Sequence, residues 1–124
     1  MRETCSWIWF IIAGVVIFVL GGLHMMTVHM NAIFGIFNPA PGDAVAWANV
    51  SWRAAHLFFM VTYILLLAAV LYHGFFGLRT ILFELGLSSG RQRFVTKFLW
   101  CVGIVLFIIG AYAAIAARAI GKIL

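Results

Sequence analysis

Three long apolar stretches, separated by two more polar segments, organise this chain. The stretches run from about Trp7 to Met30, Ala54 to Leu78 and Phe98 to Ala117. Their lengths are close to the roughly 20 residues that an α-helix needs to cross the hydrocarbon of a bilayer. Segments in hydrocarbon must be helical, because every backbone N–H and C=O there needs an internal partner. The pattern predicts a single transmembrane domain over residues 1–124, an all-α membrane protein with helices at about 7–36, 53–84 and 94–120.

Composition and charge support the same class. The 124 residues are 66% hydrophobic and only 9% charged, which is too apolar a balance for a soluble domain. The net charge of +5 results from eight basic and three acidic residues, and most of the basic ones lie at the ends of the apolar stretches. This distribution is typical of membrane topology signals and does not indicate nucleic-acid binding. The segment ELGLSSGRQRFVTK carries Arg91, Arg93 and Lys97 and is expected on the cytoplasmic side.

The four histidines all lie in or beside the first two apolar stretches, at positions 24, 29, 56 and 73. Ionisable groups at membrane depth are costly, so each is a candidate site residue, although a histidine can also serve as an interhelical or headgroup-level hydrogen-bonding residue. His24 and His29 point roughly 140° apart on a helix, and His56 and His73 are about 25 Å apart along its axis. The spacing excludes a compact zinc or di-iron site within this chain. It permits haem held between imidazoles of two different helices.

The depths of these histidines indicate two such sites. His24 lies roughly 25 Å along the first helix from Trp7 at the cytoplasmic edge, in the outer half of the membrane, whereas His73 lies within about 9 Å of the same cytoplasmic edge, which Arg79 marks. We therefore expect His73 and His24 to bind an inner and an outer haem, with His56 as the alternative outer ligand because it lies at a similar depth. Gly21 and Gly77 share a helical face with the two ligands and could give a porphyrin clearance. Close helix packing explains glycines equally well.

The residues that carry this pattern resemble a known family. LGGLHMMTVHM (residues 20–30) and AAVLYHGFFGLRTILFELG (residues 68–86) look like the membrane-anchor cytochrome b subunits of succinate dehydrogenase and fumarate reductase. The element H-G-x-x-G-L-R, residues 73–79, is similar to the haem-ligand helix of those anchors. The resemblance covers residues 10–113 and favours the D-type small anchor, since the His-Arg-x-Ser/Thr-Gly element of C-type anchors is missing. Leu71 stands where some fused members of the family have a glutamate.

The resemblance implies a division of labour within a larger complex. A flavoprotein subunit and an iron–sulfur subunit would carry out succinate oxidation or fumarate reduction, and this chain would hold no dehydrogenase active site. A second three-helix anchor subunit would form a bundle with this chain and share two haems b, from which electrons pass to a quinone, with menaquinone favoured. The complex would lie in the inner (cytoplasmic) membrane of a prokaryote as a multi-pass protein. With the basic segment on the cytoplasmic side, the N-terminus is expected to be cytoplasmic and the C-terminus outside.

Three further residues are candidates for contacts with these groups. Arg79 could pair with a haem propionate or a quinone oxygen, or could act only as a topology signal. Tyr72 and Trp52 could line a quinone site, although aromatic residues are also common at membrane interfaces. Two other functions remain open: a haem-free anchor that only shapes a quinone site, and a small transporter subunit. The second predicts intramembrane carboxylates, whereas the acidic residues here lie at the ends of the apolar stretches.

Overall fold

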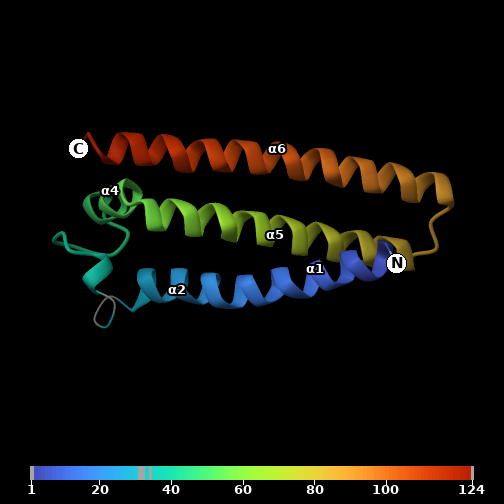
Figure 1. The fold of residues 1–124 in the computed structure, drawn as a ribbon, viewed down its shortest axis with the longest axis horizontal. Coiled ribbons are helices and arrows are strands. Elements are labelled where there is room, and N and C mark those ends of the chain that lie inside the picture. The colour runs from blue at the N-terminus through green and yellow to red at the C-terminus, as the bar shows by residue number, and fades with distance from the viewer. Residues whose placement is uncertain (1, 31–32, 34, 124) are drawn as a thin grey trace.

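The computed structural model describes residues 2–30, 33 and 35–123, and its long helices lie side by side in one layer (Figure 1). The first helix comprises α1 (Arg2–Val16), a π-helical turn η1 (Ile17–Gly21) and α2 (Gly22–His29). It is followed by α4 (Trp47–Ala55), α5 (Leu57–Glu84) and α6 (Ser89–Gly121). α5 lies in the middle and packs against α1 on one side and α6 on the other. The described residues contain no strand, and three helices are long and apolar enough to span a membrane, which confirms the predicted fold class.

The helix bounds differ in places from those expected. The first long helix ends at His29 and not at residue 36, and residues 31, 32 and 34 of the expected range lie outside the described part of the chain. The expected helix 53–84 is interrupted at His56, which has extended backbone angles (φ −89°, ψ 131°). The reason is a competing hydrogen bond: Nδ1 of His56 donates to the Trp52 carbonyl (2.6 Å), the acceptor that its own backbone N–H would use in a continuous helix.

A buried polar cluster closes the end of the layer that holds residues 35–56, which we call the loop end. Asn49 is fully buried, exchanges hydrogen bonds with the backbone of Ala40 and also donates to the Asp43 carbonyl. Arg53, 4% exposed, donates to the Asn38 side chain and to the Ala44 carbonyl. Because backbone in a loop must find hydrogen-bond partners when it is buried, these side chains fix residues 38–44 against α4.

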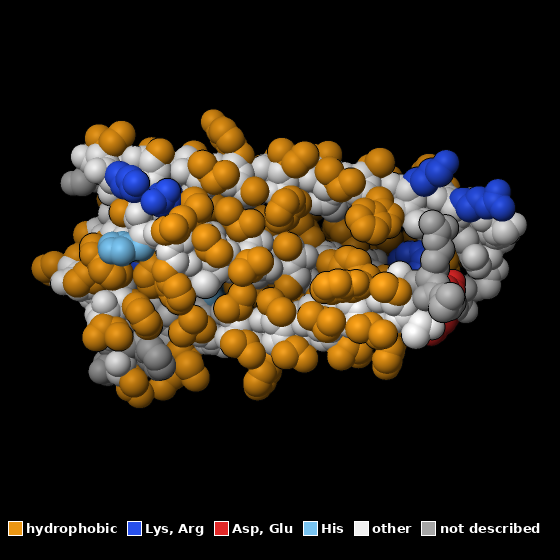
Figure 2. Space-filling view, in the orientation of Figure 1, with side chains coloured by type: hydrophobic (Ala, Val, Ile, Leu, Met, Phe, Trp, Pro, Cys, Tyr) orange, Lys and Arg blue, Asp and Glu red, His pale blue; other side chains and the backbone are white. Residues whose placement is uncertain are grey.

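The single layer leaves most of its apolar surface uncovered. In the most apolar part of each long helix, only 6% to 11% of the residues are buried within the chain, and Phe18 is 83% exposed. Figure 2 shows apolar side chains over the middle of the layer, with Lys and Arg gathered at both ends. Such a surface is stable only in lipid or against other apolar helices.

Candidate functional site between α1 and α5

His73 lies in the interface between α5 and α1, at the end of the layer that holds the N-terminus. Its Nδ1 is 3.1 Å from the Phe10 carbonyl oxygen, and its ring stacks on the Phe10 ring (centroids 4.1 Å apart, planes at 8°). A carbonyl oxygen only accepts, so Nδ1 must carry the proton and Nε2 of the neutral ring has a free lone pair. Within the described residues Nε2 makes no hydrogen bond. This is the tautomer that a histidine needs in order to bind a metal through Nε2.

The contact between these two helices is reciprocal. A Cβ built on Gly14 of α1 would lie 3.2 Å from Cε1 of His73, so the imidazole occupies the space beside this glycine. A Cβ built on Gly77 of α5 would lie 3.6 Å from the Phe10 ring. The clearance beside Gly77, which was expected to serve a porphyrin, is therefore taken by Phe10 in this chain. Sequence reasoning missed Gly14 because it lies on another helix, 59 positions before His73.

His24 lies towards the loop end, in the same interface. Its ring packs edge-on against Tyr63 of α5 (centroids 5.3 Å apart), and its Nδ1 is buried with no hydrogen-bond partner among the described residues. The π-helical turn η1 ends at Gly21, three residues before His24. A Cβ built on Gly21 would lie 3.8 Å from the side chains of Ile17 and Leu66. A buried unpaired nitrogen is costly, so His24 is a site that an external partner could complete.

The two histidines are separated in depth, as expected. His24 contacts α5 at Tyr63, whereas His73 itself lies ten residues further along the same helix. At 1.5 Å per residue these levels are about 15 Å apart. In addition, the described residues contain no group of three or more His, Cys, Asp or Glu that could hold a metal ion. Each imidazole would therefore need a partner ligand from another chain.

The other two histidines lie at the loop end. His56 is exposed at the break between α4 and α5 and packs on the Trp52 ring (centroids 4.1 Å apart). His29 is exposed at the end of α2. His24 packs against α5 within the apolar part of the layer, and neither of these two histidines does.

Arg79 and Tyr72 line one continuous hollow, whereas Trp52 does not. A cavity of about 270 Å³ lies between α5 and α6, and a second one of about 850 Å³ adjoins it at the N-terminal end. Both cavities are lined by Tyr72, Phe76, Arg79, Thr96 and Trp100. Trp52 lies in α4 at the opposite end of the layer, so one headgroup cannot contact all three predicted residues.

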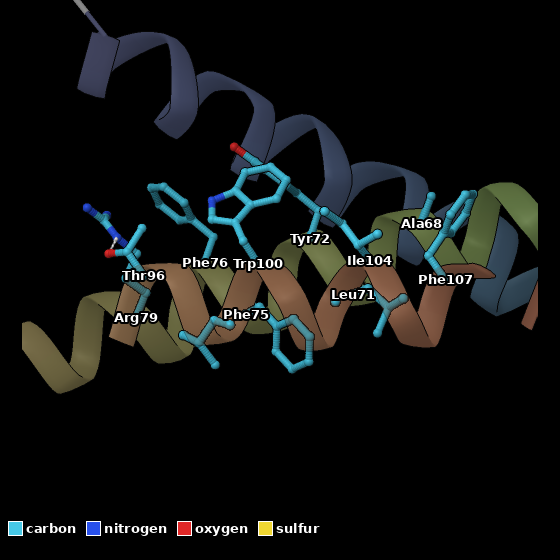
Figure 3. A pocket seen from close by; sticks show the side chains of 12 residues that line it. Ala68, Leu71, Tyr72, Phe75, Phe76, Arg79, Thr96, Trp100, Ile104 and Phe107 are labelled. Carbon is cyan, nitrogen blue, oxygen red and sulfur yellow. Dashed lines mark hydrogen bonds between the residues drawn. The ribbon is translucent and has the colours of Figure 1, made fainter. Parts of the chain in front are cut away.

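The polar groups in this hollow are partly engaged (Figure 3). Nε of Arg79 donates to the Thr96 hydroxyl (3.0 Å), and its guanidinium carbon lies 4.3 Å from the centre of the Phe83 ring. Its two terminal nitrogens make no hydrogen bond to the described residues and can still donate. The Tyr72 hydroxyl donates to the Ser6 carbonyl (3.0 Å), so towards a ligand it can act only as an acceptor.

The fold and these sites define a multi-pass α-helical membrane protein with imidazoles at two depths of a helix interface. The family model described as the transmembrane subunit of succinate dehydrogenase/fumarate reductase matches residues 2–113, and the chain belongs to this family. It is similar to the succinate dehydrogenase hydrophobic membrane anchor subunit of Archaeoglobus fulgidus, with 29% identity over 110 residues that cover 89% of this chain and 86% of the relative. No solved structure matches the chain. It is thus a membrane anchor subunit of an oxidoreductase complex, associated with the other subunits of that complex and with the membrane.

Proposed function

We propose that this anchor binds haem b through His73 and His24 and carries electrons between an iron–sulfur subunit and a membrane quinone. The observation that carries the proposal is His73: its Nδ1 donates to the Phe10 carbonyl, which leaves Nε2 as the ligating atom. His24 supports the proposal because its ring nitrogen is buried and unpaired about 15 Å away in depth. Haem b, once bound, supplies a one-electron redox couple.

The chain's own residues would orient and shield this cofactor. Phe10 fixes the ring plane of His73 by stacking on it, and its carbonyl accepts the Nδ1 proton. The second ligand of each iron would come from a second three-helix anchor subunit, which would also cover part of the exposed layer. Ligation by two imidazoles would favour electron transfer over oxygen chemistry.

The hollow that contains Arg79 is the proposed quinone site, with menaquinone favoured. The terminal nitrogens of Arg79 would donate to a quinone oxygen, and the apolar cavity towards Phe107 has room for part of an isoprenoid chain. The alternative partner for the same nitrogens is a haem propionate. We place the N-terminus and this hollow on the cytoplasmic side of the membrane, because the basic residues around Arg91 favour that orientation.

A haem-free anchor is the second candidate, and one contact favours it. Phe10 fills the space beside Gly77 and stacks on His73, so one face of this imidazole is already packed against α1 of the same chain. In that case His73 would serve only to join α5 to α1.

A haem count of the purified complex separates the two candidates. We expect the dithionite-reduced minus oxidised spectrum to show a b-type band with two haems per flavin. His73→Ala should remove the inner haem, and His24→Ala the outer one, each leaving about half of the band. His56→Ala is the matched control and should leave both haems in place. If the wild-type complex shows no such band, the haem-free anchor is the correct candidate. If His56→Ala loses the outer haem, His56 and not His24 is the outer ligand.

A further inference from the structure

The imidazole of His73 is held in a slot that α1 forms, and this slot has two walls. One wall is the Phe10 ring, parallel to the imidazole within 8°. The other is the bare backbone of Gly14, one helical turn further along α1. Because the carbonyl of Phe10 also accepts the Nδ1 proton, three separate contacts from one turn of α1 fix the position of one side chain.

Gly14 leaves no spare room in this slot. A Cβ there would lie 3.2 Å from Cε1 and 3.4 Å from Nδ1 of His73, closer than ordinary van der Waals contact at the nearer atom. The imidazole cannot move away freely, since the Phe10 ring stacks on its face and Phe10 itself fills the space beside Gly77. Even one methyl group at Gly14 must therefore displace or tilt the imidazole.

We propose that Gly14 is a positioning residue for His73, which sets the direction in which Nε2 leaves α5. The inner site thus requires a small residue on α1, beside His73, as well as at Gly77 of α5. This inference rests on the proposed function insofar as Nε2 of His73 ligates haem. The slot itself is a property of the chain and can be tested without haem.

The test compares glycine variants of the complete complex. Gly14→Ala and Gly14→Val are the test variants, and Gly22→Ala is the matched control, because a Cβ at Gly22 of the same long helix would meet nothing within 4 Å. For each complex we would record the low-temperature EPR g-values and the midpoint potential of both haems. We expect Gly14→Ala to shift the inner haem alone and Gly14→Val to shift it further or to remove it. Gly22→Ala should match the wild type at the inner haem.

Two results would overturn the inference. In the first, Gly14→Ala lowers the thermal stability of the complex but leaves the g-values and potential of the inner haem unchanged. Gly14 would then have only a structural role. In the second, both haems shift equally, which would be a global effect.

A haem-free readout separates this inference from the proposed function. In a complex labelled with ¹⁵N-histidine, the ¹⁵N NMR spectrum of the wild type is compared with that of His73→Gln. The signals that are missing in the variant belong to the ring nitrogens of His73. We expect a neutral ring protonated at Nδ1, whose shifts change in Gly14→Ala and not in Gly22→Ala. If the wild type contains no haem, the proposed function fails, and these shifts still decide whether Gly14 positions the ring. Unchanged shifts in Gly14→Ala would reject the slot.

Discussion

At the scale of single residues, two side chains of α5 show how local contacts select chemistry. His73 has its tautomer fixed by a backbone carbonyl of another helix, which leaves one nitrogen for a ligand. Arg79 uses one nitrogen to bind the Thr96 hydroxyl and keeps its terminal nitrogens available. In both cases the residue type was visible in the sequence, but the partner that fixes its geometry is more than 15 positions away.

The role of Arg79 can be tested by changing its charge. If it donates to a quinone oxygen, Arg79→Gln should raise the KM for quinone about 10-fold to 100-fold, because a hydrogen bond to a charged group contributes about 1.5–3 kcal/mol. Steady-state kinetics with a soluble quinone analogue measures this, and Arg93→Gln, at an exposed position of α6, is the control. A shift in the midpoint potential of the inner haem with an unchanged KM would instead assign Arg79 to a propionate. If neither changes, Arg79 is a topology residue.

At the scale of elements, the packing of α6 depends on glycines that allow close approach. Gly103 lies against the Phe75 ring, and Gly110 lies against the Leu67 side chain. Gly121 has the tightest backbone contact: a Cβ there would lie 2.6 Å from the Ser51 carbonyl oxygen and 2.9 Å from the Ala55 nitrogen. A flexible side chain such as Leu67 can rotate away from an added methyl group, whereas the backbone of α4 cannot.

Two glycine substitutions in α6 should therefore have opposite effects on stability. Gly121→Ala should destabilise the packing of α4 on α6 by about 1–3 kcal/mol, the usual cost of overpacking. Gly90→Ala, where a Cβ would meet nothing within 4 Å, should be neutral or stabilise α6 by up to about 1 kcal/mol. Thermal unfolding of the detergent-solubilised complex measures both changes. Equal unfolding temperatures for the two variants would contradict the close contact at Gly121.

At the scale of the whole molecule, the flat layer and the distribution of charge decide how the chain lies in the membrane. Basic side chains mark both ends of the layer, and the apolar surface between them is nearly continuous on the face seen in Figure 2. Arg91, Arg93 and Lys97 lie near the start of α6, and this concentration of basic residues should lie on the cytoplasmic side. The C-terminal end of α6, with Arg118 and Lys122, is then outside despite its charge.

This orientation can be measured with single cysteines. In a chain lacking Cys5 and Cys101, Ser88→Cys and Lys122→Cys place one exposed thiol at each end of α6. A membrane-impermeant maleimide should label Lys122→Cys in right-side-out vesicles and Ser88→Cys only in inverted vesicles. A chain that keeps only Cys101, about 18 Å along α6 from Ser89, is the control and should react in neither. The reverse labelling pattern would invert the topology.

The sequence by itself determined the class of the protein and indicated which histidines form its candidate site. Three apolar stretches of the right length permit only membrane helices, because lipid offers backbone groups no other partner. The distances of His24 and His73 from the expected membrane edges already indicated two sites at different depths. The motif at residues 73–79 indicated the family, to which the family model now assigns the chain.

Only the tertiary structure decided which residues act together. Gly14 and Phe10 meet His73, and Asn38 and Arg53 hold the loop end, through contacts between segments whose relative position no local pattern specifies. The same holds for the break at His56, where a side-chain hydrogen bond outcompetes helix continuation, and for the separation of Trp52 from Tyr72. Hydrophobic periodicity reports which segments are buried in lipid, but nearly every face of these helices is apolar. The choice of neighbours therefore rests on side-chain shape and hydrogen bonding, which only the folded chain reveals.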